Sequence, residues 1–259
     1  MFAPPPREFI YTAYKLDVIF ADDLGQEKSC YGTGFLLAAE ETVVLVTNRH
    51  VVDLDYDAPD RRYTRFAIKL LRLHGRGGDD KRYELELDHR QPFAFPDARE
   101  NDLACLVNFR GNNPDPNFKL FHHMRVSDLA TAQDFRDSIW AGDRVYFAGY
   151  PSVHDKLDQR PILRAGVVAS DPKFDYSISG SHEGNKVAYE AMSTPGASGS
   201  PVFAPARGFA GAPYARGDLL AGINAGHIHG DQGAHSGMSY FIKATAIRAL
   251  LAKQGVAGA

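Results

Sequence analysis

The sequence predicts an all-β protein made of two six-stranded antiparallel β-barrels and a short C-terminal helix. Short segments rich in β-branched and aromatic residues recur along the chain and are separated by Gly, Asn, Asp and Pro, a pattern typical of β-barrels. Helical periodicity is clear only near the C-terminus, where Ile247, Leu250 and Leu251 predict a helix over residues 244–254. The chain of 259 residues, 44% of them hydrophobic, suffices for one large domain or two compact lobes.

The expected strands form two groups of six. Each segment carries the β-branched or aromatic residues that strands favour, and turn signals stand on either side of it. The first group is expected at residues 9–21, 32–37, 42–47, 62–74, 81–88 and 103–107. The second group is expected at residues 143–149, 161–169, 186–192, 200–204, 218–225 and 237–244.

A polar segment separates the two groups. Residues 111–137 begin with Asn, Asp and Pro and have no clear strand character. They are therefore expected to connect an N-terminal lobe, residues 9–110, with a C-terminal lobe, residues 138–259. A short helical turn is expected near residues 127–137.

Composition and charge exclude several classes of partner. A formal charge of -3 and a pI near 6.4 do not suit a nucleic-acid-binding surface. Every apolar run is interrupted within about ten residues, short of the ~20 that a membrane-spanning helix needs. The N-terminus lacks the features of a secretion signal, so a cytoplasmic location is expected, or a secreted one if the chain is a processed form.

The sequence contains two cysteines, Cys30 and Cys105, too few for a disulfide scaffold. Both are expected to be buried thiols, although a disulfide between them is not excluded by the sequence.

The stretch 193–203 carries the first functional signal. Gly196 and Gly199 flank Ser198, an arrangement that allows a tight turn and aims backbone amides into one small space. The apolar pair after it predicts a buried strand, so Ser198 is expected on a loop anchored by rigid structure. Gly/Ser turns before strands are common, however, and a nucleophilic serine needs partners.

Two other stretches supply those partners. His50 and Asp102 follow or precede predicted strands of the N-terminal lobe, so a cleft between the lobes would assemble them with Ser198. Acyl-bond hydrolysis needs a nucleophile, a base and an acid that orients the base, which are the roles that Ser198, His50 and Asp102 can fill. The amides of Gly196 and Ser198 would form the oxyanion hole. Each residue alone could be an ordinary turn or strand-end residue, but all three occur together along the chain in the order His, Asp, Ser. This order disfavours an esterase of the α/β-hydrolase fold, in which the catalytic residues follow the order Ser, acid, His.

Six short motifs follow one another along the chain, and together they cover roughly residues 10 to 251. They are Gly32-Thr33-Gly34-Phe35, Val46-Thr47-Asn48-Arg49-His50-Val51-Val52, Asn101-Asp102-Leu103-Ala104, Gly149-Tyr150-Pro151, Gly196-Ala197-Ser198-Gly199-Ser200-Pro201-Val202 and Gly222-Ile223-Asn224. This series resembles the trypsin-like, chymotrypsin-fold serine peptidases, above all the bacterial glutamyl endopeptidases and high-temperature-requirement proteases.

The resemblance implies a double β-barrel with the active site between the barrels. It also implies a serine endopeptidase that acts on peptide or protein substrates through an acyl-enzyme, without metal or organic cofactor. Such an activity inside a cell needs restraint by narrow specificity, a regulatory partner or activation. The alternative is a catalytically silent or activator-dependent binding module with a protease fold, and the complete set of Ser198, His50 and Asp102 argues against it.

Two positions depart from the family pattern. Ala197 stands where digestive members carry an aspartate that pairs with a newly cut N-terminus, so that route of activation is not expected. Asn224 stands where glutamyl endopeptidases carry the histidine that recognises an acidic side chain, so glutamate specificity is not implied. By the resemblance, the primary specificity pocket includes Met192, Ser193, Asn224, Ala225, Gly226 and His227. The absence of an acid from this set argues against a preference for Lys or Arg.

Two polar clusters leave alternatives open. Residues 227–235 hold three histidines and an aspartate, which could bind zinc, line the pocket or belong to a plain surface loop; the surface loop is favoured. Asp53, Asp55 and Asp57 alternate after His50 and could form a cation site, although an exposed loop is the favoured interpretation.

Overall fold

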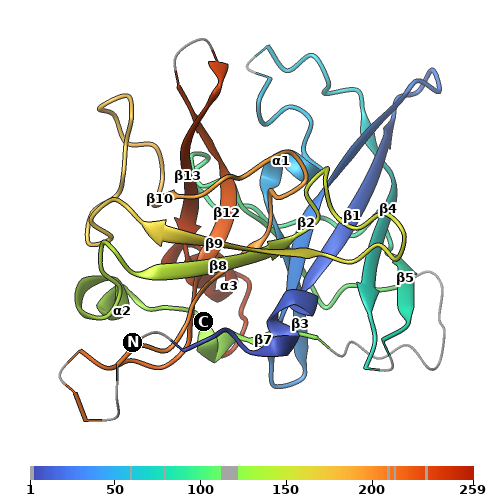
Figure 1. Cartoon of the computed structure of the whole chain (residues 1–259). Helices are drawn as coiled ribbons and strands as arrows, with labels where there is room; N and C mark the ends of the chain where they lie inside the picture. The colour runs from blue at the N-terminus through green and yellow to red at the C-terminus, as the bar shows by residue number, and fades with distance from the viewer. Residues whose placement is uncertain are drawn as a thin grey trace.

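The computed structural model describes residues 3–58, 60–78, 80–111, 122–208, 211–212, 214–230 and 233–259. Two β-sheets lie side by side, with a few short helices between and around them (Figure 1). The N-terminal sheet contains β1 (Ala13–Ala21), β2 (Glu27–Ala39), β3 (Thr42–Thr47), β4 (Ala67–Arg76), β5 (Arg82–Glu86), β6 (Ala104–Val107) and β7 (Met124–Arg125). The C-terminal sheet contains β8 (Arg144–Gly149), β9 (Ile162–Val168), β10 (Lys186–Glu190), β11 (Pro201–Ala204), β12 (Leu219–His229) and β13 (His235–Lys243). The helical elements are η1 (Arg7–Thr12), α1 (Arg49–Val52), η2 (Val126–Asp128), α2 (Ala132–Asp137) and α3 (Ala244–Lys253).

The C-terminal sheet is a closed barrel, as the sequence predicts. Its strands follow the order β10-β13-β12-β11-β8-β9, and the last strand pairs with the first. All of its strand pairs are antiparallel. The predicted C-terminal helix is also confirmed, as α3.

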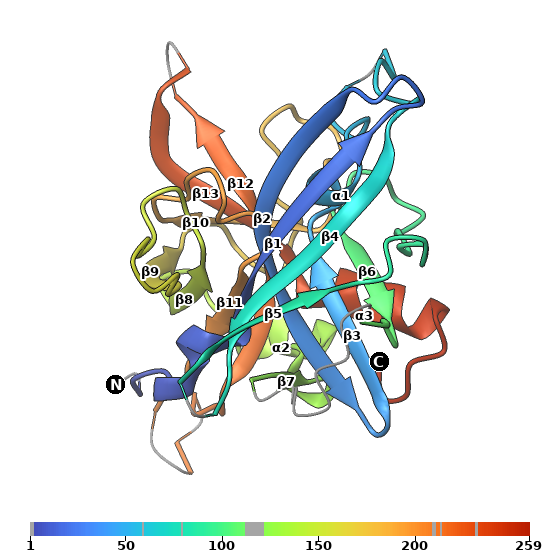
Figure 2. The ribbon, with the colours of Figure 1, turned by 90° about the vertical axis from the view of Figure 1, so that its right-hand side faces the viewer.

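The N-terminal sheet is open, so the prediction of a second closed barrel is wrong. Its strands follow the order β5-β4-β1-β2-β3-β6, and β7 adds a short parallel pairing to β2 (Figure 2). Among the described residues, the segment after β5 meets β6 and its continuation through two isolated bridges, Leu87 with Gly111 and Ala94 with Cys105, instead of through a ladder. The chain turns directly after Leu87, because the Asp88 carboxylate accepts from the Arg90 amide and the Asp88 carbonyl accepts from the Gln91 amide, so no continuous ladder to β6 forms.

Several predicted boundaries shift where local hydrogen bonds compete with strand pairing. Residues 9–12 belong to η1, where the Thr12 hydroxyl donates to the Phe9 carbonyl, so the first strand begins at Ala13. Residues 62–66 form turns held by the Asp55 carboxylate, which accepts from the Tyr63 amide. Such side-chain bonds offer the backbone an alternative to a strand.

The predicted connection 111–137 holds more structure than its polarity indicates. Its later part contains β7, η2 and α2, the last close to the helical turn expected there. Thr131 caps α2 by accepting a hydrogen bond from the Asp134 amide, a typical helix start. Residues 112–121 of this segment lie outside the described residues.

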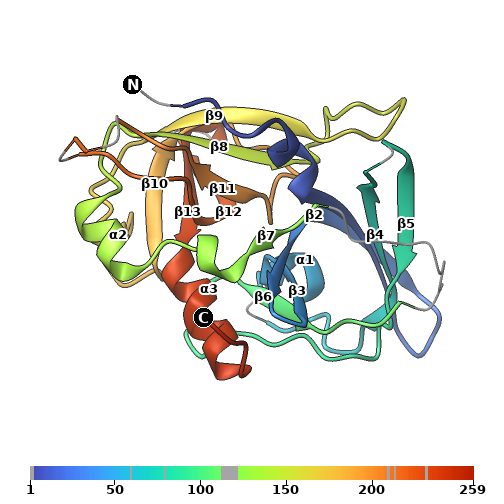
Figure 3. The same cartoon turned by 90° about the horizontal axis from the view of Figure 1, so that it is seen from below.

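Two hydrophobic cores explain the continuous apolar runs of the central strands. Leu36, Leu45 and Leu106 pack into a core inside the N-terminal sheet. Their neighbours Phe35 and Val46 point the other way, into a larger core that includes the barrel and α3. Because successive strand residues face opposite sides, β2 and β3 are buried on both faces, and Figure 3 places α3 at the junction between sheet and barrel.

The described residues include no helix long and apolar enough to cross a membrane. Both cysteines are free thiols: Cys105 is buried in β6, whereas Cys30 is only half-buried in β2.

Candidate active site

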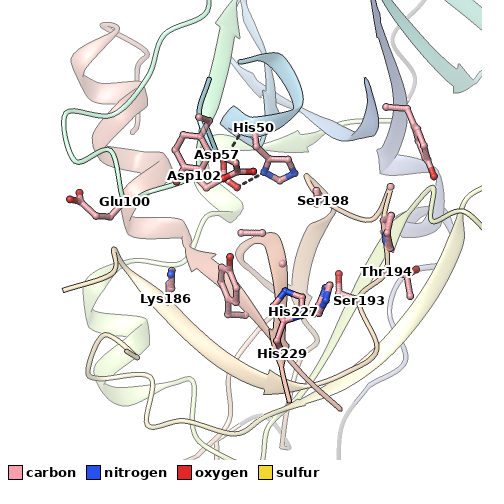
Figure 4. Close-up of a pocket in the computed structure, with 17 residues that line it drawn as sticks. His50, Asp57, Glu100, Asp102, Lys186, Ser193, Thr194, Ser198, His227 and His229 are labelled. Atoms are coloured by element: carbon pink, nitrogen blue, oxygen red, sulfur yellow. Dashed lines mark hydrogen bonds and ion pairs between the residues drawn. The ribbon is translucent and has the colours of Figure 1, made fainter. Parts of the chain in front are cut away.

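A pocket of about 400 Å³ is lined by residues of both lobes. Figure 4 shows His50 and Asp102 on one side of it, His227 and His229 on the other, and Ser198 beside His50. The sequence-predicted residues that line the pocket are His50, Asp102, Ser193, Gly196, Ser198, Ala225, Gly226 and His227.

Ser198 is a central residue of the second of two consecutive β-turns, which meet at Ala197. In the first turn the Ala197 amide donates to the Thr194 carbonyl, and Pro195 and Gly196 occupy the central positions. Gly196 has a φ of +91°, and Pro followed by a left-handed Gly is the preferred sequence of a type II turn. The second turn repeats this arrangement, since the Ser200 amide donates to the Ala197 carbonyl and Gly199 also has a φ of +91°.

The two turns, residues 194–200, form the serine loop, which the N-terminal lobe fixes through Thr33 of β2. The Thr33 amide donates to the Ser198 carbonyl at 2.8 Å, and the Thr33 hydroxyl donates to the Gly196 carbonyl at 2.8 Å. The same hydroxyl accepts from the Tyr150 amide at 3.0 Å. A Cβ added to Gly199 would lie 1.7 Å from the Thr33 carbonyl oxygen, so only glycine permits this approach. The loop is therefore held from the opposite lobe.

Neither N–H group of the predicted oxyanion hole is engaged. Within the described part of the chain, no hydrogen bond uses the amide of Gly196 or of Ser198, and both residues line the pocket. Two free amides beside one hydroxyl can stabilise a developing negative charge on oxygen.

His50 lies on α1, directly after β3 ends. Its ring Nδ1 lies 2.6 Å from Asp102 Oδ2, and its backbone amide donates to Asp102 Oδ1 at 3.1 Å. Asn48, at the N-cap of α1, donates from its side chain to the Asp102 carbonyl at 2.6 Å. These three bonds fix the position of Asp102 under the imidazole and, with it, the tautomer of His50.

The loop that carries Asp102 is joined to the barrel next to this site. The Asn101 side chain donates to the Asn185 side chain at 3.0 Å and accepts from the Asn185 amide at 2.8 Å. Asp102 itself is only 6% exposed. The backbone next to Asp102 is therefore fixed to the barrel by contacts between the lobes.

The electrostatic environment of His50 suits a general base. Burial lowers the pKa of His50, but the hydrogen bond and charge of Asp102, together with the charge of Asp57, raise it by more. The pKa of His50 therefore lies above its usual value of 6.5. Among the described residues the Ser198 hydroxyl makes no hydrogen bond to His50, and contacts of this kind often tighten only when substrate binds.

Two of the residues expected around the specificity pocket lie elsewhere. Asn224 is fully buried, and its side chain bonds Tyr189, Ser193 and the Ala197 carbonyl. Asn224 therefore does not line the pocket but holds Ser193, which does, and the backbone next to Ser198. Met192 is exposed and lines a separate hollow of the barrel surface.

The histidines of the 227–235 stretch belong to a hairpin of β12 and β13 instead of a plain loop. The His227 ring contacts both neighbours, with centroid distances of 4.5 Å to His229 and 4.7 Å to His235. His227 and His229 line the pocket. No group of three or more His, Cys, Asp or Glu among the described residues is arranged to hold a metal ion. Residues 231 and 232 lie outside the described part.

The three aspartates after α1 differ in their contacts. Asp53 pairs with Arg49 at 2.8 Å, and Asp55 organises the turn at Tyr63. Asp57 instead lines the pocket. Their alternation in the sequence does not distinguish them. Thr33 stands in the quoted motif Gly32-Thr33-Gly34-Phe35, but the motif did not indicate its positioning role, and Asn185 stands in no motif.

Comparisons with known proteins agree with this geometry. A family model described as "Trypsin-like peptidase domain" matches residues 32–210, more than half of the chain. The crystal structure of Deg5 has a similar fold, with a TM-score of 0.53 and 14% sequence identity over 92% of this chain and 86% of that chain. No curated protein matches. The resemblance seen in the sequence is confirmed, and the chain belongs to the trypsin-like peptidase family.

Proposed function

We propose that the protein is a serine endopeptidase with Ser198 as nucleophile, His50 as general base and Asp102 as the acid that orients it. The observation that carries this proposal is the 2.6 Å contact between His50 and Asp102 in the pocket that Ser198 also lines. Membership of a peptidase family supports a peptide or protein substrate.

The proposed reaction has two halves. Ser198 Oγ attacks the scissile carbonyl carbon while His50 takes the hydroxyl proton, and the amides of Gly196 and Ser198 stabilise the oxyanion. The C–N bond then breaks as His50 returns the proton to the leaving amine. Water repeats the sequence on the acyl-enzyme and releases the carboxylic acid and free Ser198. Asp102 stays ionised throughout and stabilises the imidazolium of His50.

The test is cleavage of an unbiased peptide library by the purified protein and by Ser198→Ala. We expect the wild-type protein to cut at defined residues and the variant to be inactive. A fluorophosphonate probe, which reacts only with an activated serine, should label the wild-type protein and not the variant. Failure of the folded wild-type protein both to cleave and to be labelled would contradict the proposal and favour a binding module.

A further inference from the structure

The loop of residues 94–102, which ends at the proposed acid, is held against α1 by side chains that the proposed chemistry does not use. Arg49, directly before His50 on α1, places its guanidinium carbon 4.3 Å from the centre of the Phe95 ring. Its Nε atom lies 2.8 Å from the Asp53 carboxylate at the end of the helix. This guanidinium therefore joins the helix of the proposed base to the 94–102 loop.

Tyr56 and Arg99 form a second attachment, in which each side chain bonds the backbone of the other residue. The Tyr56 hydroxyl donates to the Arg99 carbonyl at 3.0 Å, and the Arg99 guanidinium donates to the Tyr56 carbonyl at 2.8 Å. The same guanidinium donates to the Asp55 carbonyl at 2.9 Å. Figure 4 shows the next residue, Asp57, beside His50. Three hydrogen bonds thus connect the turn after α1 to the 94–102 loop.

The Tyr56 ring contacts both guanidinium groups. Its centre lies 5.7 Å from the guanidinium carbon of Arg49 and 5.3 Å from that of Arg99, a range in which a cation is attracted to an aromatic face. The ring therefore supports both attachments at once. Arg49, Tyr56 and Arg99 are called the clamp below.

The clamp acts close to Asp102 along the chain. Arg99 lies inside the turn 98–101, which a 3.1 Å bond closes between the amide of its last residue and the carbonyl of its first. Asp102 follows this turn directly, and its carboxylate makes the 2.6 Å contact with His50 Nδ1. Because a hydrogen bond weakens when its distance and angle change, movement of the turn would weaken this contact.

We propose that Tyr56 is a positioning residue, whose clamp keeps the Asp102 carboxylate aligned with the His50 imidazole. The inference rests on the proposed endopeptidase function, because alignment matters to catalysis only if His50 transfers a proton. Tyr56 also lines the pocket, so an effect on alignment must be separated from an effect on substrate contact. Arg99 permits this separation, since it is not among the described residues that line the pocket.

The test compares peptide cleavage by Tyr56→Leu, Tyr56→Phe and Arg99→Lys. Leucine removes the ring and the hydroxyl, and we expect kcat to fall about tenfold because misplaced catalytic groups react slowly. Phenylalanine keeps the aromatic face under both guanidinium groups, so Tyr56→Phe should regain most of this loss. Arg99→Lys keeps the charge but loses the planar group that bonds two carbonyls. Its kcat should fall about 3- to 10-fold, with KM changed less than about twofold.

The second readout is the proton NMR signal of His50 Nδ1–H, recorded in a Ser198→Ala background so that it does not depend on cleavage. The short bond to Asp102 should place this signal far downfield in the parent protein. Tyr56→Leu and Arg99→Lys should each move it upfield, because the bond to Asp102 weakens. The charge at position 99 stays the same, so the effect of Arg99→Lys reports on position.

The matched control is Tyr63→Leu. Tyr63 is a half-buried tyrosine of the same lobe, its ring centre lies 5.0 Å from the Lys28 ammonium, and it is not among the described residues that line the pocket. This variant should keep both kcat and the NMR signal.

An unchanged NMR signal in Tyr56→Leu and Arg99→Lys would overturn the inference, even if kcat falls. If Tyr56→Leu does not fold, the exposed and conservative change Arg99→Lys decides alone. Absence of all cleavage by the wild-type protein would count against the endopeptidase itself. In that case the NMR signal still shows whether the clamp aligns Asp102: an upfield shift supports the inference, and no shift refutes it.

Discussion

At the scale of single residues, Thr33 anchors the serine loop 194–200 from the N-terminal sheet without lying in the proposed reaction path. Its hydroxyl bridges the Gly196 carbonyl and the Tyr150 amide and is completely buried. We expect Thr33→Val to lower the free energy of unfolding by about 1–3 kcal/mol, because buried polar partners are left unpaired. We also expect kcat to fall at least about tenfold, since the turn at Gly196 loses its anchor.

The control for Thr33→Val is Thr12→Val. Thr12 also has a buried hydroxyl, which donates to the Phe9 carbonyl far from the pocket. Denaturant unfolding should show a lower free energy of unfolding in both variants. Peptide cleavage should be slower only in Thr33→Val. A Thr33→Val protein with wild-type kcat would refute the positioning role.

In the proposed mechanism, His50 sets the acid side of the pH profile. The imidazole accepts the serine proton only when neutral, and its pKa is raised above 6.5 by Asp102 and Asp57. Activity is therefore present above that raised pKa and lost as pH falls through it. We expect kcat/KM to decline with a midpoint above pH 6.5, and the midpoint to move to lower pH in Asp57→Asn. A midpoint at or below 6.5 in the wild-type protein would contradict this.

At the scale of elements, the turn Ala197–Ser200 depends on close contact with β2. Gly199→Ala adds a methyl group 1.7 Å from the Thr33 carbonyl oxygen, besides the strain of a φ of +91°. Left-handed backbone alone costs a non-glycine residue about 1–2 kcal/mol. We expect this variant to lose more stability than that, and to lose cleavage activity because the loop must move.

Gly142→Ala separates strain from contact. Gly142 has the same φ of +91°, but a Cβ there meets nothing within 4 Å. The difference in unfolding free energy between Gly199→Ala and Gly142→Ala therefore measures the contact with β2. Equal losses in the two variants would show that the close approach has no energetic weight.

The sequence predicted the bounds of an element best where burial of apolar side chains alone determines them. The apolar run of β3 fixes its bounds, 42–47, as a strand buried on both faces. Two predictions failed for different reasons. The Asp55 carboxylate holds residues 62–66 in turns, where a strand was predicted. The strands β12 and β13 extend to His229 and from His235, so the three histidines lie in a hairpin and not in a plain loop. Closure of the N-terminal sheet depends on how strand ends meet in space, which no local pattern encodes.

In the candidate site, too, the sequence predicted some residues and missed others. The sequence predicted that His50, Asp102 and Ser198 lie together because each stands in a recognisable motif, and all three line one pocket. Thr33 and Asn185 were missed because their bonds cross between lobes, over sequence separations that composition and periodicity do not report. Met192 was misplaced in the pocket because neighbours along a chain can face different surfaces.

At the scale of the whole molecule, the larger core joins the two lobes. It contains Phe35 and Val46 of the sheet together with barrel residues and Leu251 of α3. We therefore expect the lobes to unfold in one cooperative transition. Fluorescence of Trp140, the single tryptophan, reports on the C-terminal lobe, and the reactivity of the buried Cys105 thiol reports on the N-terminal one.

The measurement is a denaturant titration followed by both probes in a Cys30→Ser background, which removes the more accessible thiol. Coincident midpoints are the expected result. Midpoints that differ beyond experimental error would show that the sheet and the barrel are separate folding units, despite the core that they share.

The bonds from Thr33 to the serine loop also make the molecule suitable for division into two parts. A C-terminal lobe produced alone would contain Ser198 but lack both the proposed base, His50, and the strand that holds the Gly196 turn. Each half should therefore be inert, and reassociation should restore the complete site in a single step. Fused to two other proteins, the halves would act as a complementation reporter whose signal measures how closely those proteins approach.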